Sequence, residues 1–365
     1  MVAIAGIAFA GILILMQLGF LDALFEGATS PHRTLDADLV VCNPRQKTFF
    51  SPKSFPRQRL YQVLGYEGVQ SVSGLQVGTT LWRNPLTQQI RSILVFGMDP
   101  AHAAFKLEGV RKNIDRITLL NRVLFDRGSR PEFGPIARLF EKLGLVDTEL
   151  NERRVRVAGL FTIGASFTAD GTVITSDTTF ANIFNRRRND DIEVGLIKLN
   201  PGVDPRFVQR SLIRRFSNEV AVYTLDEFAE LERSYWATSS GIGFIFGLGV
   251  FVGFIVGVVI VYQILYADVS DHMSEYATLK AMGYTDRYLL VVLLEESLIL
   301  AVLGYIPGLA ISMGMYWLAH SFTLLPIHMT IQRSLFVFFL TVVMCSISAA
   351  IAMRKLREAD PADIF

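Results

Sequence analysis

The sequence is poor in the residues and motifs on which catalytic and metal sites depend. It has two cysteines and five histidines in 365 residues, and no H-E-x-x-H, G-x-S-x-G or Walker A pattern. Cys42 lies in a strand-like segment and Cys345 in an apolar run, so we predict neither a disulfide nor a metal cluster between them. We therefore expect no catalytic residue, metal or cofactor in this chain, and any ATP that drives the protein must be bound by a separate subunit.

An excess of one charge is also absent. Lys and Arg number 35 and Asp and Glu number 34, so the net charge is +1 at pH 7 and nothing indicates a nucleic-acid partner. The chain is instead rich in apolar residues, since 51% of it is hydrophobic and its mean hydropathy is +0.38. This composition is too apolar for a simple soluble protein and indicates a membrane protein.

Four apolar runs are long enough to cross a bilayer, which takes about 20 residues of helix. They cover residues 1–20, 241–266, 288–319 and 335–353, and the third contains Pro307, at which it can bend. We predict an α-helical membrane protein with four transmembrane helices. The first run could instead be a signal peptide, but it lacks a basic n-region and an A-x-A cleavage site, so we favour an anchor. The chain starts inside this run, and whether its N-terminus is complete stays open.

Basic residues beside the spans predict the orientation, because they concentrate on the cytoplasmic side. The tail at 354–365 opens with three basic residues, so we place it in the cytoplasm. The loop at 267–287 is then cytoplasmic too, whereas the short loop at 320–334 and the large segment at 21–240 lie outside. The sequence thus predicts a multi-pass inner-membrane protein with a large periplasmic domain.

The segment 21–240 alternates strand-like and helical stretches. Stretches rich in Val, Ile and Phe predict strands at residues 36–43, 91–98, 153–164 and 171–176. Residues 193–216 are typical of a strand, a Pro-Gly turn and a helix, with Asp204 and Pro205 as its N-cap and first residue. Residues 223–240 predict a helix that leads into the second span. We predict an α+β domain in which helices pack on short sheets.

No group of residues in this domain indicates catalysis. Ser166 lacks the closing glycine of a nucleophile elbow, so we interpret it as a turn serine. The basic triplet at 186–188 is followed by Asp190 and Asp191, which favours a solvated loop over an anion site. The histidines are isolated from one another and suggest no metal site.

Small residues recur at helical spacing in two of the spans. Gly249, Gly253 and Gly257 lie four apart in the second span, and Gly304 and Gly308 repeat the spacing in the third. Such stripes let helix backbones approach closely in lipid, so we predict that they are packing faces. The alternative is that glycine is simply common in membrane helices.

Two carboxylates, Glu295 and Glu296, lie about two turns into the third span. A carboxylate there is costly and usually faces protein or water. The pair indicates either a substrate or proton path, or near-interface side chains that reach the headgroups or bond to a neighbouring helix. We favour the second reading.

The loop at 267–287 is typical of a short amphipathic helix, residues 268–283. Its apolar face is formed by residues at helical spacing: Val269, Met273, Tyr276 and Leu279. Glu275 and Lys280 lie on its other sides, and Gly283 fits the C′ position that ends a helix. A connection that only closed a hairpin could be far shorter, so we expect this helix to dock into a groove on a cytosolic partner.

The same segment, "VSDHMSEYATLKAMGY", resembles the V-x-x-R-x-x-E-I-G-x-x-[KR]-A-x-G motif of MacB/FtsX-like ABC permeases. The matching positions are Val269, Glu275, Lys280, Ala281 and Gly283. His272 stands where the motif has arginine, and Ala277 where it has glycine, which puts in doubt any salt bridge from position 272.

Three other parts of the chain resemble this superfamily. The third span matches at Glu296, Gly304 and Gly308, and the tail matches at Pro361. In the outer segment, "VAGLFTIGASFTADGTVITSDTTFANIF" resembles the permeases of DevBCA-type cyanobacterial exporters. The large domain between the first two spans also agrees with the superfamily.

The resemblance implies a homodimeric permease that works with a separate ABC ATPase, a periplasmic adaptor (membrane fusion protein) and an outer-membrane channel. It implies export of glycolipid or related envelope material, although the substrate itself does not follow. It also implies that the loop helix is the coupling helix that sits on the ATPase, through Val269, His272, Met273, Glu275, Tyr276, Leu279, Lys280 and Gly283. The alternatives are an FtsX-like regulator that activates a periplasmic hydrolase, disfavoured by the size of the outer segment, and a membrane-anchored enzyme, disfavoured by the missing motifs.

Overall fold

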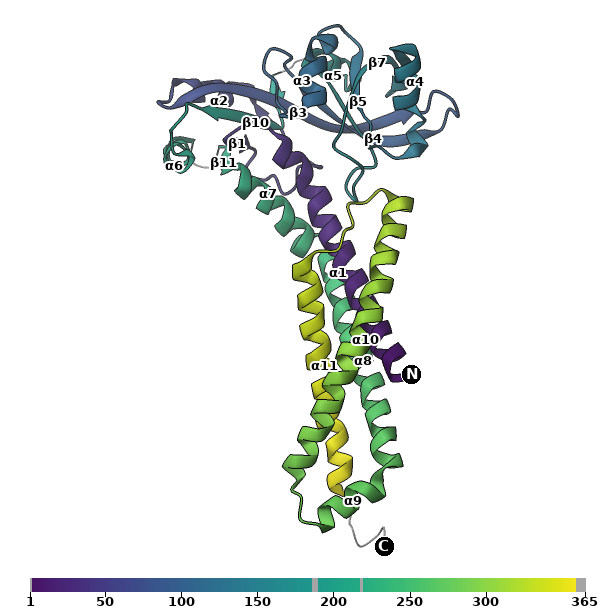
Figure 1. Cartoon of the computed structure of the whole chain (residues 1–365). Helices are drawn as coiled ribbons and strands as arrows, with labels where there is room; N and C mark the ends of the chain where they lie inside the picture. The colour runs from purple at the N-terminus through teal and green to yellow at the C-terminus, as the bar shows by residue number, and fades with distance from the viewer. Residues whose placement is uncertain (1, 186–189, 217–218, 359–365) are drawn as a thin grey trace. The chain divides into compact units, whose positions relative to one another are not determined.

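The computed structural model describes residues 2–185, 190–216 and 219–358, and it describes no side chain for residues 2 and 354–358. The basic triplet at 186–188 and Pro361 therefore lie outside the described residues. The chain divides into two compact units, which we call the membrane unit and the sheet domain (Figure 1). The membrane unit comprises Met1–Asp22, Gly241–Phe322 and Ile327–Phe365, and the sheet domain comprises Ala23–Ser240 and Thr323–Pro326.

Four long helices carry the membrane-spanning stretches, as predicted. They are α1 (Val2–Thr34), α8 (Ile242–Asp271), α10 (Asp286–Thr323) and α11 (Ile331–Glu358). Each is long and apolar enough to cross a membrane. The prediction ended the first span at residue 20, where polar residues begin, but the helix itself continues to Thr34. Hydropathy predicts only the apolar part of a helix that can lie in lipid, whereas the helical backbone hydrogen bonds of α1 continue beyond that part.

Four glycines of the two stripes in the membrane unit lie nearest to α1, and Gly257 lies nearest to Met344 of α11. An added Cβ at Gly249 would lie 2.6 Å from the Gln17 side chain, and one at Gly304 would lie 2.6 Å from Ile7. Such distances are shorter than real Cβ contacts, so these positions have no room for a side chain. The helix α1 is thus packed between α8 and α10 through small residues.

The sheet domain is built on one nine-stranded sheet whose order is β11-β1-β10-β3-β4-β8-β5-β7-β6. Its strands are β1 (Leu39–Cys42), β3 (Val69–Arg83), β4 (Ile90–Met98), β5 (Arg122–Asp126), β6 (Val146–Leu150), β7 (Arg153–Phe161), β8 (Thr172–Ser176), β10 (Val194–Leu199) and β11 (Ala221–Thr224). The short strands β2 (Phe55–Pro56) and β9 (Asp191–Ile192) form a separate pair.

The long strand β3 belongs to two parts of this sheet (Figure 1). Its end pairs with β6 at Trp82↔Leu150 and Arg83↔Glu149, so the strands from β3 to β6 close into a ring of six. Its start pairs with β10 and so joins the ring to the β10-β1-β11 extension. The fully buried Trp82 fills the ring, where its Nε1 donates a hydrogen bond to the carbonyl of Phe133 at 3.1 Å.

Short helices complete the domain. They are α2 (Arg57–Gln62), α3 (Glu108–Asn113), α4 (Ile136–Leu143), α5 (Asp177–Ile183), α6 (Pro205–Phe216) and α7 (Leu225–Ser234). The helix α6 begins at the predicted residue because Asp204 Oδ1 accepts the backbone N–H of Arg206 at 3.0 Å. The prediction of an α+β domain between the first two membrane helices is confirmed.

Candidate functional site

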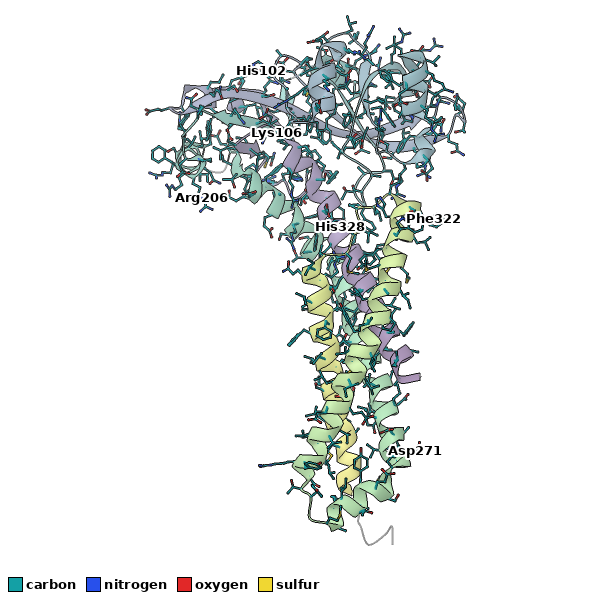
Figure 2. The ribbon with its side chains drawn as sticks, viewed as in Figure 1. His102, Lys106, Arg206, Asp271, Phe322 and His328 are labelled. Atoms are coloured by element: carbon teal, nitrogen blue, oxygen red, sulfur yellow. The ribbon has the colours of Figure 1, made fainter. Side chains whose placement is uncertain are left out.

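The candidate site lies at the end of the membrane unit where α8 leads into α10. Figure 2 labels Asp271 at this end and Phe322 at the opposite end of the bundle. The helix α8 continues through Val269 to Asp271, the backbone leaves helical geometry at His272 with φ −104° and ψ 22°, and the short helix α9 (Met273–Ala281) follows. The prediction of one helix over residues 268–283 was therefore wrong at its start, since Val269 belongs to the membrane helix.

The apolar face of α9 packs on its own bundle. Met273, Tyr276 and Leu279 are half-buried against a core formed by α8, α10 and α11, and Ala277 is buried among them. The expectation that these apolar residues dock into a groove on a partner stays a prediction, and the structure shows that the chain's own helices already cover part of this face. The helical spacing indicates the apolar face, but a sequence alone does not tell whether that face is covered by the same chain or by another.

The exposed surface of this end is mainly polar. Glu275 and Thr278 are exposed on α9 itself, and His272 is exposed directly before it. Beyond it, Met282 is 63% exposed and Tyr284 is 44% exposed. We call these five residues the tip surface. Two of its members, Met282 and Tyr284, were not among the predicted site residues, although large apolar side chains beside a helix-ending glycine are a signal that could have found them.

A glycine cap fixes the shape of the tip. Gly283 has a φ of +94° and occupies C′, as its position in the sequence predicts. The N–H of Tyr284 donates to the carbonyl of Leu279 at 3.1 Å, and the N–H of Gly283 donates to that of Lys280 at 3.0 Å. This is a Schellman arrangement, and the ion pair between Lys280 Nζ and Asp286 at 3.4 Å joins α9 to the start of α10.

His272 replaces the arginine of the motif that the sequence resembles, and it caps the end of α8. Its Nδ1 lies 3.0 Å from the carbonyl oxygen of Asp268. This hydrogen bond, together with the carboxylates of Asp268, Glu275 and Asp271, raises the pKa of the His272 imidazole. His272 therefore helps to stabilise the junction between α8 and α9 when it is protonated.

The two intramembrane carboxylates have different surroundings. Glu295 is exposed, whereas Glu296 is half-buried and forms a side-chain hydrogen bond with Asp268 of α8. Glu296 therefore connects α10 to the end of α8 directly beside His272.

The opposite end of the membrane unit has a buried polar cluster that the sequence did not reveal. Arg333 of α11 is buried, and its Nε donates to Asp22 of α1 at 3.0 Å. Its Nη1 donates to the carbonyl of His328 at 2.9 Å, and its guanidinium lies 5.6 Å from the ring centroid of Tyr316. The hydroxyl of Tyr316 donates in turn to the carbonyl of Leu15. We call Asp22, Tyr316 and Arg333 the arginine joint, which connects α1, α10 and α11.

A second buried polar cluster lies in the sheet domain, between α1 and α7. The carboxylate of Glu232 accepts hydrogen bonds from Thr48 Oγ1 at 2.6 Å, the Phe49 N–H at 2.6 Å and Trp236 Nε1 at 2.7 Å. His32 lies 3.7 Å from the same carboxylate. Burial raises the pKa of Glu232, although the three hydrogen bonds oppose that effect.

The described residues contain no group of three or more His, Cys, Asp and Glu that could hold a metal ion. Ser166 lies in a turn, where its Oγ accepts the N–H groups of Thr168 at 3.2 Å and Ala169 at 3.1 Å. What the arrangement offers is an exposed helical tip, with a fixed shape, on a bundle of membrane helices.

Comparison with known proteins supports part of the resemblance. Residues 239–361 match the family described as FtsX-like permease C-terminal. No curated protein matches the chain. The periplasmic region of MacB from Actinobacillus actinomycetemcomitans is 11% identical, with a TM-score of 0.38, over 54% of this chain and 94% of that one. The extracellular domain of the ABC-type transporter YknZ from Gram-positive bacteria is 14% identical, with a TM-score of 0.35, over 52% of this chain and 99% of that one.

The family match covers α8 to α11, which include the tip surface and three of the four membrane-spanning helices. The structural likenesses are remote and assign no function. Four membrane-length helices together with the FtsX-like match fit a multi-pass inner-membrane protein whose large domain lies in the periplasm.

Proposed function

We propose that the chain is the permease subunit of an ATP-driven exporter of the MacB type, and that its tip surface docks on a separate ABC ATPase. The observation that carries this proposal is the arrangement of the α9 end. There the apolar face of a short capped helix packs on the bundle, and His272, Glu275 and Met282 are exposed. The FtsX-like match over residues 239–361 supports it independently.

The proposed mechanism is mechanical. ATP binding closes the ATPase dimer, α9 moves with it, and the membrane helices relay the movement to the sheet domain. The ion pair of Lys280 with Asp286 and the contact of Glu296 with Asp268 would make α9 move with both α10 and α8. No bond chemistry is assigned to this chain, and it needs no cofactor of its own.

The remaining partners follow the resemblance of the outer segment to DevC, the permease of DevBCA-type exporters. On that reading the permease is a homodimer, a periplasmic adaptor receives the substrate from the sheet domain, and an outer-membrane channel completes the path. The cargo is glycolipid or a related lipophilic envelope component.

Co-purification with the ATPase tests the docking role. We expect Glu275→Arg combined with Met282→Ser to reduce recovery of the ATPase at least about tenfold, since exposed hot-spot residues cost more than about 1 kcal/mol when replaced. The matched control is Arg206→Glu combined with Phe207→Ser, on exposed positions of α6 in the sheet domain. Wild-type recovery in the tip variant, or equal loss in the control, would contradict the proposal.

A further inference from the structure

A cleft of about 630 Å³ opens on the outer face of the ring in the sheet domain. Strands β6 and β7 form its floor. One wall is the β3–β4 turn at residues 85–88, and the other is the loop at 119–121 that precedes β5. The volume falls in the range of about 300–1,000 Å³ that is usual for small-molecule sites.

Both walls are held in place by hydrogen bonds. In the turn, Asn84 Oδ1 accepts the backbone N–H of Leu86 at 2.9 Å. In the loop, Asn121 has a φ of +60°, and its N–H donates to Thr179 Oγ1 at 3.0 Å while its side-chain oxygen accepts from Asn182 at 2.8 Å. The cleft is therefore preformed, which lowers the entropic cost of binding a ligand.

Four arginines and two carboxylates line this cleft. Two of the arginines are paired across the strands. Arg83 Nε lies 2.7 Å from Glu149 Oε2, and Arg156 Nε lies 2.6 Å from Asp147 Oδ1. These pairs use both carboxylates of the floor.

The other two arginines are left without an ion pair among the described residues. Arg122 is half-buried and Arg154 is exposed, and both line the cleft. The strand register places Arg122 opposite Arg156 and places Arg154 opposite Glu149, so they lie on the same face of the sheet. The cleft thus has two uncompensated positive charges on a rigid floor.

Apolar side chains lie directly beside these charges. Leu119 is 54% exposed and Leu120 is 60% exposed, and both line the wall formed by the loop. Two adjacent exposed leucines would contact an apolar group that entered beside the arginines. The cleft therefore offers an anion site and an apolar surface to the same ligand.

We propose that this cleft binds an anionic amphiphile, with its phosphate or carboxylate group on Arg122 and Arg154 and its apolar chain against Leu119 and Leu120. Guanidinium groups suit such anions because they can donate two parallel hydrogen bonds. A small ligand fits better than a protein surface, because the free cations converge in one cleft and are not spread over a flat patch. As a substrate class the inference rests on the proposed function, but binding itself does not depend on it.

The probe is dodecyl phosphate, titrated below its micelle concentration against the full chain in peptidiscs, with calorimetric detection and with no ATPase present. We expect saturable binding of one ligand per chain. Arg122→Gln combined with Arg154→Gln should weaken it about tenfold or more, since it removes two charge-assisted contacts. The matched control is Arg210→Gln combined with Arg214→Gln, which removes two exposed arginines of α6 and should leave binding within about twofold of wild type.

Two further arms separate the parts of the ligand. Inorganic phosphate should bind at least about tenfold more weakly than dodecyl phosphate, and Leu119→Ser combined with Leu120→Ser should remove that difference. Unchanged binding in the cleft variant, equal loss in the α6 control, or equal affinity for inorganic phosphate would each overturn the proposal. A further pair of results would also overturn the proposal: wild type binds no dodecyl phosphate, and the cleft variant no longer co-purifies with a periplasmic adaptor. The surface would then be a protein interface. Because no ATPase takes part, a failed docking test leaves this result intact.

Discussion

The two ends of the membrane unit are held together in opposite ways. At one end the arginine joint buries a full charge and satisfies it from α1, from α10 and from the loop before α11. At the other end α9 has a half-buried apolar face, and its Glu275 and Thr278 side chains are exposed. A buried charge allows few alternative geometries, because separation from its partners leaves it unpaired. The comparison indicates a fixed end and an end that is free to meet a partner.

The largest expected effect comes from removing the buried charge of the arginine joint. Arg333→Met should lower the free energy of unfolding by about 3 kcal/mol, because it removes the charge-assisted hydrogen bonds that the buried guanidinium donates to the Asp22 carboxylate and to the carbonyl of His328. Thermal unfolding of the purified chain in detergent measures it. Arg287→Met removes an exposed arginine at the other end and should change stability by less than about 0.5 kcal/mol. Equal effects at the two positions would contradict the contrast between the ends.

The next effect tests the packing between the ends. Gly257→Val should cost about 2 kcal/mol, because its Cβ would lie 2.0 Å from Met344 Sδ and 2.9 Å from the Cβ of Ala10. Gly247→Val is the matched control on the same helix, where an added Cβ meets nothing within 4 Å. Unfolding of both variants in the same detergent provides the measurement. Equal destabilisation would show that glycine is needed for the helix and not for close packing.

The third prediction concerns the buried Glu232 cluster between α1 and α7, which would also hold α1 in place inside the sheet domain. The raised pKa of this carboxyl means that its contribution to stability is fully present below its ordinary pKa and is lost as pH rises through the raised value. Glu232→Gln cannot ionise, so its melting temperature relative to wild type should rise as the pH increases above the ordinary pKa of a glutamic acid, about 4.3. The exposed Glu230→Gln should show no such trend. The same pH dependence of the melting temperature in both variants would contradict the explanation that it arises from the buried Glu232 carboxyl.

The smallest expected effect concerns the stability cost of replacing a packed and an exposed methionine at the α9 end. Met273→Ser should destabilise the chain by about 1 kcal/mol, because Met273 packs on the bundle. Met282→Ser should stay within about 0.5 kcal/mol, because Met282 is 63% exposed. The same unfolding measurement separates them. If Met282→Ser were the costlier change, the assignment of the two faces of α9 would be reversed.

Much of this architecture could be predicted from the sequence. Long apolar runs identify the membrane helices because a bilayer imposes one length on all of them. The predicted strands at 36–43, 91–98, 153–164 and 171–176 each overlap a strand of the structure, since buried β residues are distinctive. Gly283 could be placed at C′ because few residues other than glycine adopt its positive φ.

The features that were missed depend on long-range contacts. The strand β3 has alternating Gly, Ser and Gln positions and shows its character only through its pairing with β4 and β10. The ion pair of Arg333 with Asp22 joins residues 311 positions apart, and nothing local marks either of them. Which side of α9 is covered depends in the same way on where α10 and α11 pack.

Cross-linking from the tip surface shows whether this surface contacts the ATPase. Both native cysteines are buried, and burial raises the pKa of the Cys42 thiol to about 12, so an introduced exposed cysteine can be labelled selectively. A photo-reactive label at Glu275→Cys or Met282→Cys should cross-link to the ATPase subunit, and one at Glu230→Cys in the sheet domain should not. We expect cross-links to the ATPase from the two tip positions alone. No cross-link from either tip position, or equal yield from Glu230→Cys, would contradict it.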